Sequence, residues 1–169
     1  MIVLAPTGIA AINAGGVTIH SFFQVPFAPY VPESSFSADG KATYRFRYGK
    51  EKINIIRSID LLVIDEISMV RADLLDSVDA VLRRFRDRNK PFGGVQLLMI
   101  GDLQQLSPVV KDDEWQMLRK YYDTPYFFSS QALKQTEYCT IELKKVYRQN
   151  DGTFLELLNR TVSYTHLRA

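Results

Sequence analysis

Two adjacent carboxylates, Asp65 and Glu66, follow the short apolar run Leu61-Leu62-Val63-Ile64. The run is too short and too β-branched for a helix, so it predicts a buried parallel strand whose carboxyl end carries both acids. Ligands of open α/β sheets bind at that end. One acid could hold Mg²⁺ directly or through water, and the other could polarise an attacking water. The spacing suggests nucleotide hydrolysis, although a buried strand that ends in two solvated acids explains these residues as well.

A second apolar run, Val95 to Ile100, leads into the polar loop Gly101-Asp102-Leu103-Gln104-Gln105. If this strand lies beside the first, its loop faces the same ligand, and an amide there could bond to a terminal phosphate or to its attacking water. Taken alone, a Gly-Asp turn before Pro108 is a common structural feature.

The chain opens with a predicted strand, Ile2 to Ala5, a turn at Pro6-Thr7-Gly8 and a predicted helix, Ile9 to Ile12. A strand that begins at the second residue leads us to expect that the chain is cut on its N-terminal side. The next segment, Val17 to Phe23, contains His20 and Phe22. If exposed, these side chains could stack on bases and bond to phosphates of single strands; the alternative is an apolar turn with a hydrogen-bonded His.

Residues 24–40 carry three Pro and three Ser and predict a flexible loop. The region 41–57 is clearly basic, and in it Tyr44, Phe46 and Tyr48 alternate with Arg45 and Arg47. This period predicts a strand with one aromatic and one cationic face, which suits contact with nucleic acid. A solvated hairpin arm whose aromatic rings cover the core is the alternative.

Helical spacing of apolar residues predicts a helix over 73–88, whose last turns carry four Arg where the helix dipole favours cations. Further predictions are a helix over 112–122, a helical turn over 129–134, a strand over 139–143 and a helix over 153–158. Arg148 follows the predicted strand over 139–143. An Arg that leaves the end of a strand could stabilise the charge of a transferring phosphoryl group.

Composition limits the class of protein. The 169 residues are 46% hydrophobic and 24% charged, which is typical of one soluble globular domain, and a net charge of +2 does not require a polyanionic partner. Cys139 is the single cysteine, so no internal disulfide is possible, which suggests a reducing compartment. The Cys139 side chain is expected to be a small buried hydrophobe. The sequence has no apolar run of membrane-spanning length and no signal segment.

The four segments APTGIAAINAGGVTIHSFF, LLVIDEISMV, PFGGVQLLMIGDLQQLSPV and ELKKVYRQ, in this order, resemble successive motifs of the PIF-family helicases, the RecD-like branch of superfamily one. The resemblance covers about Ile2 to Thr161. It implies an α/β, RecA-like domain with a mostly parallel sheet. It also implies an ATP-driven motor that moves 5′ to 3′ on single-stranded DNA and opens duplex DNA, with ATP and Mg²⁺ as cofactors.

The resemblance also implies roles for individual residues. Asp65 matches the Mg²⁺-associated acid and Glu66 the water-activating base. Gln105 matches the amide that senses the terminal phosphate, with Asp102 in the same loop, and Arg148 resembles the arginine that contacts that phosphate. The residues in the motifs that touch single-stranded DNA are Pro6, Thr7, Gly8, His20 and Phe22.

The sequence departs from the family pattern in its phosphate-binding loop, because G-x-x-x-x-G-K-[ST] does not occur in it. We therefore expect residues 1–162 to be a partial first motor domain, with 24–57 inserted as a loop and arm, that is inactive alone. Residues 163–169 are expected to be a non-native or disordered tail.

Two other functions stay open, namely a related ATPase acting on a substrate other than DNA and a non-catalytic nucleic-acid-binding module. A monomer is favoured, located in the cytoplasm or, in a eukaryote, the nucleus.

Overall fold

The computed structural model describes residues 1–31 and 48–143. The chain divides into two compact units, residues 1–137 and 138–169. Of the second unit only 138–143 are described, so the fold presented here is that of the first unit.

The centre of the first unit is a sheet of four parallel strands, β1 (Ile2–Ala5), β2 (Val17–Thr18), β3 (Leu61–Ile64) and β4 (Gln96–Met99). Their order in the sheet is β2-β1-β3-β4. Val3 is level with Val63, and Val63 is level with Leu98. The prediction of a parallel α/β sheet with neighbouring acidic and amide-bearing strand ends is therefore confirmed.

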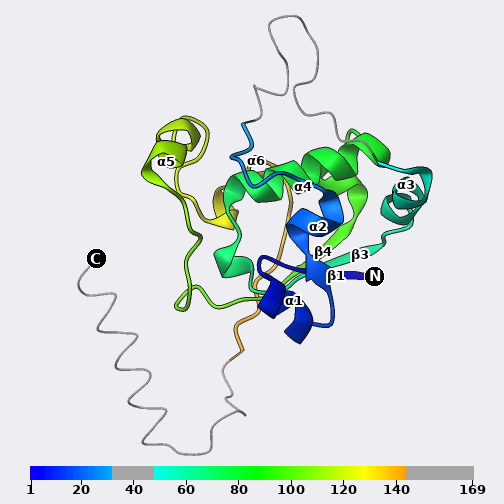
Figure 1. Cartoon of the computed structure of the whole chain (residues 1–169), viewed down its shortest axis with the longest axis horizontal. Coiled ribbons are helices and arrows are strands. Elements are labelled where there is room, and N and C mark those ends of the chain that lie inside the picture. Colours follow the sequence, from blue (N-terminus) through cyan, green and yellow to red (C-terminus); the bar gives the residue numbers. More distant parts are fainter. Residues whose placement is uncertain (32–47, 144–169) are drawn as a thin grey trace, which may run out of the picture. The chain divides into compact units, whose positions relative to one another are not determined.

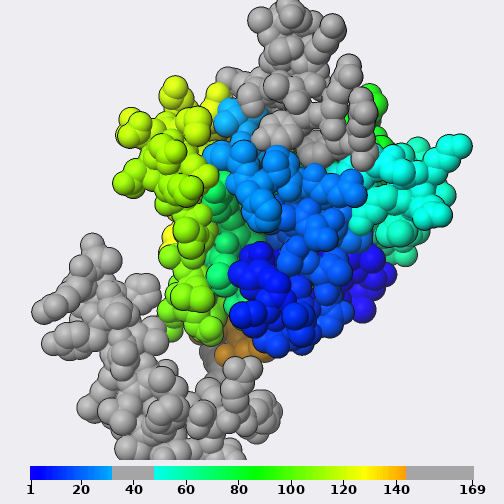
Figure 2. All heavy atoms as spheres, viewed as in Figure 1, coloured from blue at the N-terminus to red at the C-terminus, as the bar shows by residue number. Residues whose placement is uncertain are grey.

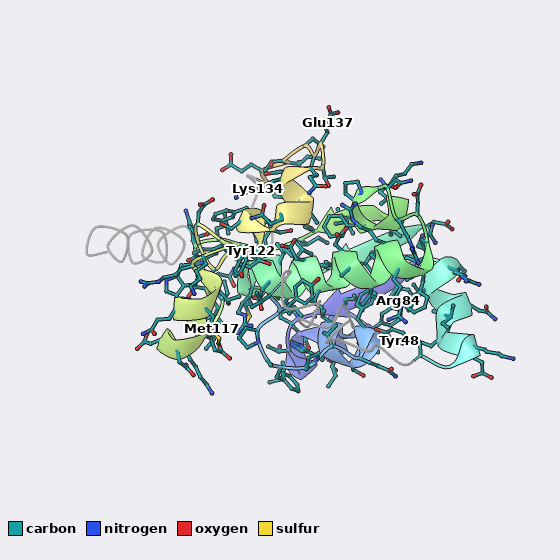
Figure 3. The ribbon with its side chains drawn as sticks, turned by 90° about the horizontal axis from the view of Figure 1, so that it is seen from above. Tyr48, Arg84, Met117, Tyr122, Lys134 and Glu137 are labelled. Carbon is teal, nitrogen blue, oxygen red and sulfur yellow. The ribbon has the colours of Figure 1, made fainter. Side chains whose placement is uncertain are left out.

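Helices of the first unit pack against this sheet (Figure 1). The longest, α4, crosses the molecule, with α3 and α5 at its opposite ends, as Figures 1 and 3 both show. The described helices are α1 (Gly8–Asn13), α2 (Ile19–Phe23), α3 (Lys50–Arg57), α4 (Ala72–Phe85), α5 (Asp112–Leu118) and α6 (Gln131–Lys134). The described residues also form the 3₁₀ turns η2 (Ile67–Met69), η3 (Pro91–Gly94) and η4 (Phe127–Ser129).

The core lies between the sheet and α4. Leu4, Leu62 and Ile64 are fully buried and share one apolar cluster with the buried face of α4, which includes Leu75 and Leu82. Burial of each large aliphatic side chain stabilises the fold by about 1.5–3 kcal/mol. This packing fixes the orientation of β3, and through it the position of the carboxylates that follow.

A tight turn returns the chain from α4 to β4. The Phe92 amide donates a hydrogen bond of 2.5 Å to the Asp79 carboxylate, and the Phe92 ring is buried. Gly93 has a φ of +61°, and a Cβ there would lie 2.7 Å from the Leu82 carbonyl oxygen. A Gly is needed at position 93 because the backbone touches the helix there.

One sequence prediction is wrong, and one helix was not predicted. Residues 50–57 of the basic region form α3, whose apolar residues recur at helical spacing and bury Ile56 against the core. Of the alternating segment 44–48, residues 44–47 lie outside the described residues. Residues 139–143 are not a strand, and Cys139 is exposed. They pair with no strand in the described part of the chain.

No helix among the described residues is both long and apolar enough to cross a membrane.

Candidate functional site

Three strand ends meet at one edge of the sheet. The Asp65 amide donates to the Leu4 carbonyl at 2.9 Å, which continues the pairing of β3 with β1. On the other side, the Ile67 amide donates to the Ile100 carbonyl, also at 2.9 Å. The acids after β3 therefore lie between the Pro-Thr-Gly turn after β1 and the Gly-Asp loop after β4.

Glu66 has an unusual backbone conformation. Its φ and ψ are 51° and 44°, in the left-handed region, and its amide donates to Asp65 Oδ1 at 3.0 Å. A side chain larger than Gly in this region carries a strain of about 1–3 kcal/mol, and such residues cluster at functional sites. The reversal turns the chain sharply after Asp65, and both acids remain partly exposed.

Gly101 allows the loop after β4 to approach this turn. A Cβ at residue 101 would lie 2.9 Å from Ile67 Cγ2 and 3.0 Å from the Ile67 nitrogen. Gly101→Ala is therefore expected to lower the free energy of unfolding by about 1–3 kcal/mol, because the loop must move away from η2. Denaturant unfolding measures this effect. Gly8→Ala is the matched control, since a Cβ there meets no atom within 4 Å, and equal losses in both variants would contradict the close approach.

Asp102 holds the Gln105 side chain in one orientation. Its Oδ1 accepts the Gln104 amide at 2.9 Å and its Oδ2 accepts Gln105 Nε2 at 2.9 Å. A carboxylate only accepts hydrogen bonds, so the amide nitrogen of Gln105 must face Asp102 and its oxygen must face away. The oxygen can then accept a hydrogen bond from a water at this edge of the sheet.

The residues predicted to touch DNA lie along the first strand end and the helix after β2. Thr7 caps α1, with its Oγ1 accepting the Ala10 amide at 3.2 Å. Pro6, Thr7 and His20 line a common cavity, and Gly8 is exposed. Phe22 does not join them. It is only 7% exposed, and Lys52 Nζ lies 3.5 Å above its ring.

His20 is half-buried beside a cluster of charged side chains. Arg71 makes a bidentate ion pair with Asp73, at 2.7 and 2.8 Å, and a further ion pair with Glu114 at 2.9 Å. Burial lowers the pKa of His20, and the positive charge of Arg71 lowers it further, against the opposing effect of Asp73. The imidazole is thus kept neutral near pH 7.

The remaining predicted residue, Arg148, lies outside the described residues. Within residues 1–31 and 48–143, no group of three or more His, Cys, Asp or Glu side chains could hold a metal ion. A cation at Asp65 would need water or phosphate oxygens as its other ligands, which is how Mg²⁺ is usually bound at nucleotide sites.

Sequence patterns did not indicate the Arg71–Asp73–Glu114 cluster or the contact of Phe27 with His20. An acid in the first turn of a helix is a normal dipole effect, so Asp73 gave no distinct signal. Phe27 lies between Pro26 and Pro29 in a segment with the composition of a loop. Only the tertiary structure shows that its ring stacks on His20, with centroids 4.4 Å apart and planes 19° from parallel.

Comparison with known proteins agrees with this geometry. The family model described as PIF1-like helicase matches residues 1–162. The chain is 39% identical over 160 residues to the ATP-dependent DNA helicase PIF1 of Saccharomyces cerevisiae, covering 94% of this chain and 17% of that protein. It is 41% identical to human PIF1 over 162 residues, covering 91% of this chain and 22% of that protein. The chain thus spans about a fifth of these relatives.

Solved structures show the same fold. The Pif1 helicase from Bacteroides, in complex with ADP-AlF3 and single-stranded DNA, is 44% identical with a TM-score of 0.89, covering 96% of this chain and 36% of that one. The Pif1 helicase of Candida albicans is 34% identical with a TM-score of 0.71, covering 95% and 33%. The parallel sheet is therefore that of a RecA-like domain, and the chain belongs to the PIF1-like helicase family.

Proposed function

We propose that this chain forms the ATP-hydrolysing part of the first motor domain of a DNA helicase. The observation that carries the proposal is the meeting of three strand ends, which brings Asp65, Glu66 and the Asp102–Gln105 pair to one edge of the sheet. The similar proteins are named ATP-dependent DNA helicases, and one similar structure holds ADP-AlF3 and single-stranded DNA.

In this proposal each residue at the sheet edge has a separate task. Asp65 binds Mg²⁺, which neutralises charge on the phosphates of ATP. Glu66 accepts the proton of the attacking water, and Gln105 positions that water with the amide oxygen that Asp102 leaves free. Arg148 contacts the terminal phosphate.

The DNA side of the proposal uses the turn after β1 and the start of α2. Pro6, Thr7, Gly8 and His20 contact single-stranded DNA, along which the motor moves 5′ to 3′ and opens duplex DNA. Phe22 is enclosed in the core, so we assign it the task of supporting α2 beneath His20. The 169 residues contain no phosphate-binding loop, and we propose that hydrolysis needs one supplied by further sequence.

The test is ATP hydrolysis by the full-length protein with and without single-stranded DNA, followed by unwinding of duplexes that carry a 5′ or a 3′ tail. We expect DNA to stimulate hydrolysis and only the 5′-tailed duplex to open. Hydrolysis that DNA does not change would favour an ATPase with another substrate. Oligonucleotide binding that survives loss of Asp65 and Glu66 but not of Arg45 and Arg47 would favour a non-catalytic module.

A further inference from the structure

Beside the predicted DNA contacts lies a cavity of about 270 Å³. Its wall includes Pro6, Thr7 and His20 from the N-terminal segment, Arg71 from the start of α4, and Val109 from the segment after β4. These segments lie side by side on the face seen in Figure 2, where the N-terminal residues are blue and those after β4 yellow-green. The volume is close to the lower limit of about 300 Å³ for small-molecule sites.

Phe27 lies at this cavity and is largely open to solvent. The residue is 82% exposed, although it also belongs to the cavity wall. One ring face is stacked on His20, at a centroid distance of 4.4 Å. Because exposure remains so high, the opposite face is available to a further planar group.

The segment that carries Phe27 is anchored on both sides along the chain. On the N-terminal side, α2 carries His20 and buries Phe22 and Phe23 in the core. On the C-terminal side, the Tyr30 amide donates to Asp73 Oδ2 at 2.9 Å, and Asp73 is only 2% exposed. The segment between these anchors is therefore oriented before any ligand binds, which reduces the entropic cost of binding.

The charges around the cavity indicate which part of a nucleotide it takes. Arg71 is the cation in the wall, but it is already paired with two carboxylates, those of Asp73 and Glu114. Asp73 also belongs to the wall, so the positive charge of Arg71 is already balanced there and is not available to a phosphate. An uncharged, planar ring suits it better, because the wall is otherwise formed largely by apolar side chains such as Pro6, Leu74 and Val109.

We propose that Phe27 is a base-stacking residue, whose open ring face receives one unpaired base of single-stranded DNA at the mouth of this cavity. The inference rests on the proposed function, because it assumes that DNA follows Pro6, Thr7 and His20. The proposed function already assigns DNA contacts to the turn after β1 and to His20. Phe27 adds a contact to a base. Stacking on an aromatic face tolerates every base, as required of a motor that moves along any sequence.

The test measures binding of a fluorescent single-stranded oligonucleotide to the full-length protein at one fixed salt concentration. Phe27→Ala is expected to weaken binding about tenfold, within the range for loss of one base–aromatic stack. Phe27→Leu, which keeps apolar bulk without the ring, should lose nearly as much, and Phe27→Trp should bind at least as well as the wild type. Thermal unfolding should be unchanged in all three, since the side chain is exposed.

Phe128→Ala is the matched control. Phe128 is also a partly exposed ring in a parallel stack, with Tyr126 at 5.3 Å and 6°, but it is not part of the cavity wall. Its loss should leave DNA affinity within twofold of the wild type.

An abasic site scanned along the oligonucleotide locates the stacked base. At one position it should weaken binding of the wild type and leave Phe27→Ala unaffected. If the wild type binds DNA and Phe27→Ala binds equally well, the inference is wrong while the proposed function stands. If Phe27→Ala changes stability but not affinity, the ring packs against another part of the protein, which also overturns the inference. Failure of the wild type to bind would overturn the proposed function itself.

Discussion

Replacing Glu66 by Gln is expected to lower the rate of ATP hydrolysis by the full-length protein by about 10²–10⁴-fold, the usual contribution of a general base. The amide has the same shape as the carboxylate but cannot accept the proton of the attacking water. Because Asp65 keeps its charge, nucleotide binding should change little. Steady-state hydrolysis measures the first effect, and binding of a fluorescent nucleotide measures the second.

The backbone at Glu66 supplies a further control. At φ 51° and ψ 44° a Gly is less strained than Glu. Glu66→Gly should therefore be as inactive as Glu66→Gln yet at least as stable in denaturant unfolding. Full activity in either variant would remove Glu66 from the mechanism. A clear loss of stability in Glu66→Gly would show that the side chain has a structural task.

Replacing Asp76 by Ala is expected to lower the free energy of unfolding by about 3 kcal/mol or more. Asp76 lies on α4 and is 6% exposed. Its carboxylate accepts four hydrogen bonds, from Tyr122 Oη at 2.8 Å, Ser130 Oγ at 2.5 Å and the amides of Gln131 and Ala132 at 3.0 and 3.1 Å. Each buried donor left without a partner costs about 1–3 kcal/mol. Urea unfolding with far-ultraviolet circular dichroism measures the loss.

The geometry around Asp76 explains why the effect should be large. Burial raises the pKa of Tyr122, and the nearby Asp76 carboxylate raises it further, so the phenol remains a donor at all ordinary pH values. Figure 3 shows Tyr122 beside α4, and Lys134 on α6. Asp76 connects α4 both to Tyr122 and to the start of α6.

Asp123→Ala is the matched control for Asp76→Ala. Asp123 pairs with Lys134 at 2.9 Å, but its side chain is 83% exposed, and such surface pairs contribute little. A similar loss of stability in both variants would contradict a special role for Asp76. Asp76→Asn should fall between the wild type and Asp76→Ala, because it keeps one acceptor oxygen and turns an amide nitrogen toward the donors.

Local patterns predicted the elements that bury a continuous apolar surface. The strands predicted at 61–64 and 95–100 became β3 and β4, and the helix predicted over 73–88 became α4, which ends at Phe85, because burial of those side chains dominates their folding. The strand predicted at 139–143 has no partner strand among the described residues. The helix at Lys50–Arg57 was not predicted, although its apolar spacing is helical.

The sequence by itself determined the family and the chemical types at the sheet edge. Carboxylates after one apolar run and amides after another are properties of residue order, and parallel strands must place such ends at one edge. Only the tertiary structure decided which side chains orient the others. The Asp102–Gln105 bond needs a loop conformation that Gly101 permits, and the Asp76 and Arg71 networks join residues up to 56 positions apart. Contacts over such separations depend on how helices pack, and no local pattern encodes that packing. For the same reason, the stacking of Phe27 on His20 is visible only in the folded chain.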